Sequence, residues 1–217
     1  MTRLLSRERI NEIAVVSPLV MWLAIGIAGS GIRVAQLLAS GAGFLLVFSQ
    51  IGTTAFLSIL IVLLVIRLPA ARKAKGVMPK LAGMLGFLLP ILVFALPRAS
   101  QTHAMAIFSS AVVLVGIAAS ILSVSWLGRS FSVLPQARGL VTEGPYRLIR
   151  HPLYMAELCV LFGRILELSQ PWSIIVMLTA IGIQITRMHF EEEVLLEEFP
   201  SYIHYKSRTA RLIPGLF

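Results

Sequence analysis

The sequence contains no aspartate, only one cysteine and few charged residues of any kind. Asp, Glu, Lys and Arg together make up 13% of the 217 residues, whereas a soluble domain has about 25%. This deficit, together with 57% hydrophobic residues, excludes an ordinary soluble domain and indicates a protein embedded in a lipid bilayer. The one cysteine, Cys159, excludes an internal disulfide bond.

The sequence also lacks the motifs of several common types of site. Its four histidines are scattered, with no pair of cysteines near them, so we expect no metal site. Neither a Gly-x-Ser-x-Gly nor a phosphate-binding Gly-Lys-Ser/Thr sequence occurs. No small-residue cleavage pattern follows the charged start, MTRLLSRERINE, which we interpret as a retained cytoplasmic tail.

Six apolar runs approach the length of about 20 residues that a helix needs to cross the bilayer. They are Ile13–Gly31, Leu45–Ile66, Leu81–Leu96, Ala104–Leu127, Leu153–Leu168 and Trp172–Thr186. The sequence therefore predicts an all-α, polytopic integral membrane protein of about six transmembrane helices in a single domain. The apolar stretch Arg33–Ser49 is predicted to be either a loop or an additional half-span.

Lys and Arg gather before the first run, between the second and third, between the fourth and fifth, and after the sixth. The opposite side would hold only Arg33 and Arg98. Because positively charged loops stay in the cytoplasm, this pattern predicts six spans with both termini cytoplasmic. The formal charge of +9 is explained in this way and does not indicate binding to nucleic acid. The short loops are typical of a bacterial or archaeal inner or plasma membrane protein.

The fifth and sixth runs are short and joined by Glu167–Pro171, which predicts a tight helical hairpin. Two antiparallel helices of similar length bring their outer ends together. The hairpin would therefore place His151 and Glu191 at the same membrane face. We expect a pocket there, at the cytoplasmic end of the helices.

A basic cluster precedes the fifth run in the stretch LVTEGPYRLIRHPLYMAE, which contains Arg147, Arg150 and His151. Pro152 suits the first turn of a helix, and the free backbone N–H groups of that turn favour an anionic group. The alternative interpretation is that these cations anchor the protein to lipid phosphates. Anchoring alone requires no Gly-Pro and no tyrosines at fixed spacing, so the whole pattern favours a binding site.

Acidic residues have both structural and functional interpretations. Glu157 and Arg164, seven residues apart in the fifth run, share a helix face, where they could form a polar pair with a neighbouring helix or line a cavity. The residues Glu191, Glu192 and Glu193 point in different directions at helical pitch, so they cannot all face one partner. Alone they would be ordinary surface charge, but the hairpin brings them to the basic cluster.

Five short motifs resemble the isoprenylcysteine carboxyl methyltransferase family and its relatives, the phospholipid N-methyltransferases. The resemblance covers Leu127 to Phe217 and rests on LVxxGPY from Leu140, RHPxY from Arg150, EExxL from Glu191, FPxYxxY from Phe199 and RLIP from Arg211. Ala156 and Pro200 stand where many relatives have glycine. The resemblance implies that residues 1–127 are N-terminal membrane helices and residues 128–217 the catalytic and cofactor-binding region.

The resemblance further implies a membrane methyltransferase that uses S-adenosylmethionine. The cofactor-binding residues would be Tyr146, Arg150, His151, Pro152, Tyr154, Glu157, Glu191 and Glu192. Glu192 and Arg208 are the predicted catalytic residues: Arg208 would orient a substrate carboxylate, whereas Glu192 would accept the proton of a substrate amine.

The expected partners are membrane lipids and a lipophilic acceptor, with a prenylated or isoprenoid carboxylate as the first choice and a phospholipid amine as the second. Two further hypotheses remain at this point: an NADPH-dependent enzyme similar to the sterol reductases, and a non-catalytic transporter or scaffold.

Overall fold

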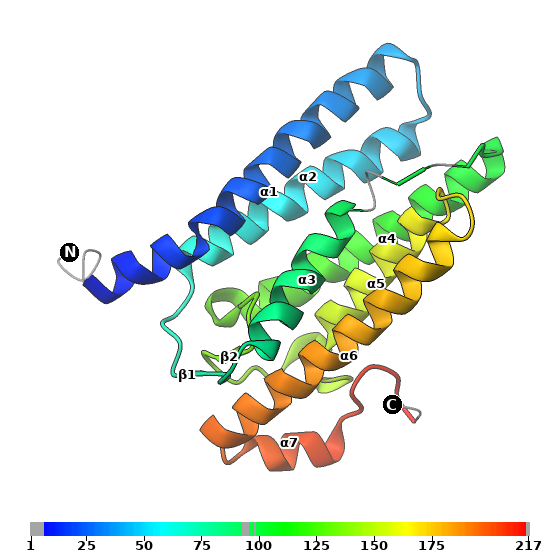
Figure 1. Ribbon diagram of the computed structural model, residues 1–217. Helices are drawn as coiled ribbons and strands as arrows, with labels where there is room; N and C mark the ends of the chain where they lie inside the picture. Colours follow the sequence, from blue (N-terminus) through cyan, green and yellow to red (C-terminus); the bar gives the residue numbers. More distant parts are fainter. Residues whose placement is uncertain (1–6, 93–95, 98, 216–217) are drawn as a thin grey trace.

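The computed structural model describes residues 7–92, 96–97 and 99–215, and its described part is almost entirely helical (Figure 1). Helices α1 (Arg7–Ala39) and α2 (Phe44–Ile66) form a long hairpin. Beside it lie α3 (Met78–Leu92), α4 (His103–Leu127), α5 (Pro152–Ile165) and α6 (Trp172–Glu198). The short helix α7 (Tyr202–Arg208) crosses one end of this bundle below α6.

Within the described residues, four helical segments are long and apolar enough to cross a membrane, namely 16–39, 44–66, 103–130 and 172–198. The prediction of a membrane protein agrees with this finding, but the number six is not confirmed. Helix α5 has 14 residues and is about 21 Å long at 1.5 Å per residue, short of the roughly 30 Å of hydrocarbon. Helix α3 has 15 residues, and the predicted third span extends into 93–95, outside the described residues.

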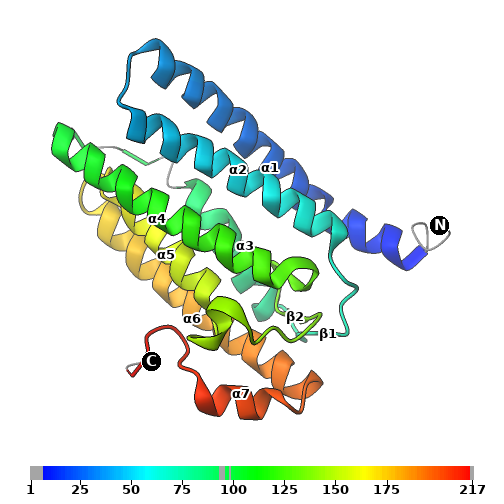
Figure 2. The same ribbon diagram turned by 180° about the vertical axis from the view of Figure 1, so that it is seen from behind.

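Helices α1 to α6 alternate in direction along the chain, as both views show (Figures 1 and 2). The α2–α3 connection, the α4–α5 connection and α7 all lie at one end of the bundle. This is the end to which the Lys and Arg distribution assigned the basic segments. The grouping of these segments is therefore observed, while their cytoplasmic orientation stays a prediction.

The stretch Arg33–Ser49 is neither a loop nor a half-span, which corrects both sequence-based alternatives. Helix α1 continues through Arg33 to Ala39, and α2 has begun by Phe44. The chain reverses between them at Gly41, which adopts a positive φ of 65°. The amide of Ala42 donates to the carbonyl of Leu37 at 2.9 Å and closes the end of α1.

Helices α4 and α5 approach each other closely because small residues line their interface. A Cβ atom at Gly163 would lie 2.6 Å from Cγ2 of Val113 and 3.0 Å from the carbonyl oxygen of Ser109. Ser109 also donates its hydroxyl to the carbonyl of Gly163 at 2.8 Å. In a membrane, such contacts and interhelical hydrogen bonds drive helix association, because lipid removes the hydrophobic driving force.

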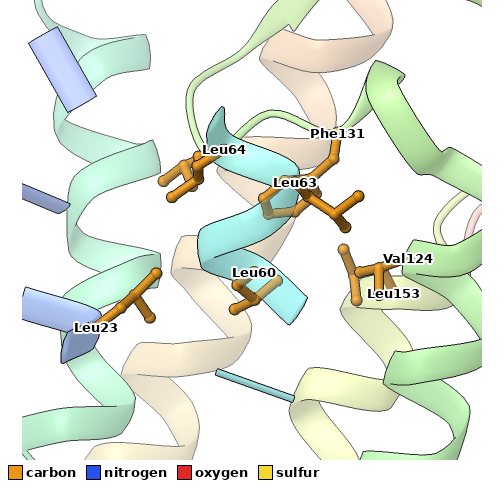
Figure 3. Packing of buried hydrophobic residues seen from close by; sticks show 8 residues of the cluster. Leu23, Leu60, Leu63, Leu64, Val124, Phe131 and Leu153 are labelled. Atoms are coloured by element: carbon orange, nitrogen blue, oxygen red, sulfur yellow. The ribbon is translucent and has the colours of Figure 1, made fainter. Parts of the chain in front are cut away.

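A second packing centre ties the α1–α2 hairpin to the site end of the bundle (Figure 3). Leu60, Leu63 and Leu64 of α2 are buried among apolar side chains from other segments. These partners are Leu23 of α1, Val124 of α4, Phe131 and Val133 of the α4–α5 connection, and Leu153 of α5. Leu153 directly follows Pro152, so this packing fixes the start of α5.

Candidate functional site

A pocket lies at the end of the bundle where α5 begins and α6 ends. Its walls come from the α4–α5 connection, the start of α5, the end of α6, and α7. Its volume is about 90 Å³. The polar side chains that line it are Ser130, Ser132, Gln136, Tyr146, Arg150, His151, Tyr154, Glu191, Tyr202 and Tyr205.

The α4–α5 connection is held against the α2–α3 connection by a two-stranded antiparallel sheet. Strand β1 (Arg72–Lys73) pairs with β2 (Gln136–Ala137). On the outer side, Arg72 donates to Glu197 and Glu198 near the end of α6, each at 3.0 Å. The N-terminal half of the chain thus supports the wall of the pocket that contains Gln136.

The sequence Gly144-Pro145-Tyr146-Arg147 forms a 3₁₀ turn that directs the chain into α5. Gly144 has a positive φ of 59°, and a Cβ atom there would lie 2.3 Å from the ring of Trp126. Glycine is therefore required both by the backbone conformation and by the close approach of the indole. Pro152 occupies the first turn of α5, as predicted, and His151 immediately precedes it.

Glu192 lies at the centre of a buried cluster of cations, with a side chain only 2% exposed. Its Oε1 accepts hydrogen bonds from Nε of Arg150 at 2.9 Å and from Nε of Arg211 at 3.0 Å, and it lies 3.2 Å from Nε2 of His151. Its Oε2 accepts from Arg211 at 2.9 Å and lies 3.3 Å from Nζ of Lys206. The predicted meeting of His151 and Glu192 is therefore observed.

The same cluster attaches the C-terminal tail to the start of α5. The amides of Arg150 and His151 donate to the carbonyls of Ala210 and Arg211 at 2.8 and 3.1 Å. The guanidinium of Arg150 also donates to the carbonyls of Lys206 and Thr209. Because both oxygens of Glu192 are engaged in this assembly, we interpret Glu192 as a residue that holds the pocket walls together.

Arg208, the second predicted catalytic residue, lies at the exposed end of α7. It does not line the pocket described above, and the pairing with Glu192 comes from Arg211 and Lys206. The predicted role of Arg208 in orienting a substrate carboxylate stays a prediction.

Glu191 differs from Glu192 in that it lines the pocket, with a side chain 22% exposed. It accepts a short hydrogen bond from the hydroxyl of Tyr154, and its Oε2 lies 3.8 Å from Nδ1 of His151. The rings of His151 and Tyr154 stack with centroids 5.4 Å apart. The guanidinium of Arg187 lies 4.4 Å from the Tyr154 ring centroid, within range of a cation–π contact.

Glu157 lies apart from the other predicted cofactor-binding residues. Its Oε2 accepts from Gln184 at 2.7 Å and from Arg187 at 3.3 Å, both on α6. It lines a separate, smaller cavity of about 20 Å³ between α3, α5 and α6. Arg164, on the same helix, instead donates to Gln50 and Thr53 of α2. Each charge thus has a neighbouring helix as partner, which is the structural alternative considered from the sequence.

Three tyrosines form the end of the pocket nearest to α7. Tyr205 donates its hydroxyl to the carbonyl of Tyr146 at 2.7 Å. The hydroxyls of Tyr146 and Tyr202 are buried and have no hydrogen-bond partner among the described residues. Burial raises the pKa of both above the usual value for tyrosine and raises the pKa of Tyr205 to about 12. Sequence reasoning quoted Tyr202 and Tyr205 as a motif but missed them as pocket residues, although their i, i+3 spacing puts them on one helix face.

A comparison with known protein families covers part of this site. The phospholipid methyltransferase family model matches residues 103–201. The match spans α4, α5 and α6, and thus includes His151, Glu191 and Glu192. It points to a membrane methyltransferase, which is the broader group that the sequence motifs resembled, but it does not single out the isoprenylcysteine branch. No match is found among curated proteins.

Proposed function

We propose that this protein transfers a methyl group from S-adenosylmethionine to a lipophilic acceptor at the membrane surface. The observation that carries this proposal is a pocket, lined mostly by residues of the matched region, that presents both signs of charge. His151 and Arg150 supply the basic side, and Glu191 supplies the acidic side. S-adenosylmethionine has a carboxylate, an ammonium and a sulfonium, so it requires both.

The residues present fit such a ligand. Glu191, already hydrogen-bonded to Tyr154, would pair with the ammonium group. The carboxylate would lie near His151 and the first turn of α5, whose backbone N–H groups have no partner within the helix. When bound, the cofactor would supply an electrophilic methyl group, and the protein would align the acceptor with it and exclude water.

The pocket must widen to admit a ligand of this size. Its volume of about 90 Å³ is below the ~300–1,000 Å³ of typical ligand sites. We expect the α4–α5 connection to be the wall that adjusts, because it consists of short irregular segments, although Phe131 and Val133 anchor its first part in the apolar core. This requirement belongs to the proposal and predicts that ligand binding protects residues of this connection from hydrogen exchange.

Two acceptors fit the proposal, and the family match favours a phospholipid amine at least as strongly as an isoprenoid carboxylate. A carboxylate attacks without losing a proton, whereas an ammonium must first be deprotonated. Since Glu192 is fully engaged with cations, Glu191 is the pocket carboxylate that could accept that proton. An amine acceptor therefore predicts a rate that rises with pH, and a carboxylate acceptor predicts little dependence near neutrality.

The test uses detergent-purified full-length protein. Calorimetry should detect binding of S-adenosylhomocysteine, and labelled S-adenosylmethionine should transfer its methyl group into vesicles containing either phosphatidylethanolamine or an isoprenoid acid. Glu191→Gln should reduce both binding and transfer at least tenfold, whereas Glu193→Gln should not, because Glu193 is exposed and pairs with His189. Absence of S-adenosylhomocysteine binding to the unaltered protein would overturn the proposal.

A further inference from the structure

The two unpartnered tyrosine hydroxyls in the pocket require an explanation. Tyr146 is 6% exposed and Tyr202 is 1% exposed, and each lines the pocket. A buried hydroxyl without a hydrogen-bond partner costs free energy, and such groups are rare in folded proteins. The other two tyrosines of the chain, Tyr154 and Tyr205, both donate to a partner.

The surroundings of these hydroxyls restrict the kind of ligand that would pair with them. On the side of the α4–α5 connection, Leu127, Leu140 and Val141 add apolar surface beside the neutral polar side chains of Ser130, Ser132 and Gln136. Tyr205 adds an aromatic ring near Tyr202 at a centroid distance of 5.7 Å. Both phenols are protonated at neutral pH, since the usual pKa of tyrosine is about 10 and burial raises it further. They therefore offer neutral hydrogen bonds beside flat apolar surfaces, which suit a heteroaromatic base or sugar hydroxyls better than an ion.

The charged groups of the pocket belong to other segments. Arg150, His151 and Tyr154 come from the start of α5, and Glu191 comes from α6. Tyr202 comes from α7, beyond the part of the chain that the family model matches. The pocket thus combines a charged set of residues with a neutral, aromatic set from the 3₁₀ turn and α7.

We infer that Tyr146 and Tyr202 bind the neutral, nucleoside half of the methyl donor through their hydroxyls, while His151 and Glu191 bind its charged amino-acid half. The inference rests on the proposed function and adds to it the residues that select a nucleoside. It makes α7 part of the ligand site and not only a surface helix.

Two single-atom changes test this assignment. Tyr202→Phe and Tyr146→Phe each remove a hydroxyl that has no hydrogen-bond partner in the described part of the chain and that the ligand would engage. Each variant should melt at the same temperature as the unaltered protein or higher, and should bind S-adenosylhomocysteine and 5′-methylthioadenosine about three- to tenfold more weakly. 5′-Methylthioadenosine lacks the amino-acid half of the methyl donor. Each substitution should therefore weaken the binding of 5′-methylthioadenosine as much as the binding of S-adenosylhomocysteine.

Tyr205→Phe is the matched control, because its hydroxyl already donates to the carbonyl of Tyr146. Tyr205→Phe should lower the melting temperature of the free protein, whereas Tyr202→Phe and Tyr146→Phe should leave it unchanged or raise it. Unchanged affinity of Tyr202→Phe and Tyr146→Phe for both probes would overturn the inference while leaving the proposed function intact. A loss confined to the KM of the lipid acceptor would overturn it as well. If the unaltered protein binds neither probe, the proposed function and the inference both fail.

Discussion

Three consecutive glutamates on α6 have three different environments, because each successive residue of the helix points in a different direction. Glu192 is buried among cations, Glu191 lines the pocket beside Tyr154, and Glu193 pairs with His189 at the exposed surface. Their 100° separation was predictable from helical pitch. Helical pitch could not predict which of the three is buried, because this depends on where the tail that contains Lys206 and Arg211 packs against α6.

Glu192→Gln should destabilise the protein strongly, because it leaves Arg150, Arg211 and Lys206 without their shared anion. Breaking a buried ion pair by removing one partner costs about 3–5 kcal/mol. Thermal unfolding in detergent should show a clearly lowered midpoint, whereas Glu193→Gln should leave the midpoint unchanged. Equal stability of the two variants would mean that the cluster does not hold the tail.

Tyr205 should make stability sensitive to alkaline pH. Burial raises its pKa from 10 to about 12, so the unfolded chain loses this proton at lower pH than the folded protein. Its contribution is fully present below about pH 10 and is lost as the pH rises towards 12. In melting curves recorded from pH 8 to 12, the difference in stability between the unaltered protein and Tyr205→Phe should therefore shrink above pH 10. A difference that stays constant to pH 12 would contradict this assignment.

At the scale of helices, hydropathy locates most of the membrane helices, but side-chain contacts are needed to explain where α6 ends. The apolar runs located α2, α4 and the start of α6 within a few residues, because long uninterrupted apolar sequences have few alternatives in lipid. The sixth apolar run ends at Thr186, and α6 continues twelve residues beyond it, through the glutamates that the sequence analysis placed at helical pitch. The helix continues to Glu198 because Arg187 and Glu192 find buried partners there.

The α4–α5 interface should tolerate no added methyl group at Gly163. Gly163→Ala would bring Cβ to 2.6 Å from Val113 and 3.0 Å from a backbone oxygen, so overpacking should cost about 1–3 kcal/mol. Gly182→Ala is the control, since Gly182 is helical, exposed and has no atom within 4 Å of its added Cβ. We expect the control to be neutral or to gain up to about 1 kcal/mol from helix propensity. Equal melting temperatures for the two variants would show that α4 and α5 separate easily.

At the scale of the whole molecule, the charge pattern and the helix directions lead to the same arrangement. The Lys and Arg residues of the α2–α3 connection, the α4–α5 connection and α7 gather at the end of the bundle that contains the pocket (Figures 1 and 2). The sequence predicted this grouping correctly while counting six full spans, because the positive-inside pattern depends only on the alternation of direction. A short helix such as α5 preserves the alternation without covering the full hydrocarbon thickness.

Labelling of single cysteines from one side of the membrane tests this arrangement. With Cys159 replaced by Ala, new cysteines at Lys75 and Ser207 would lie at the pocket end, and one at Ser40 at the opposite end; all three positions are exposed. An impermeant maleimide added to intact spheroplasts should label Ser40→Cys but should label Lys75→Cys and Ser207→Cys only after lysis, if the basic end is cytoplasmic. The reverse pattern would place the pocket outside, away from cytoplasmic methyl donor. Labelling of Lys75→Cys and Ser40→Cys from the same side would mean that α2 does not cross the membrane, although its 23 mostly apolar residues are long enough to do so.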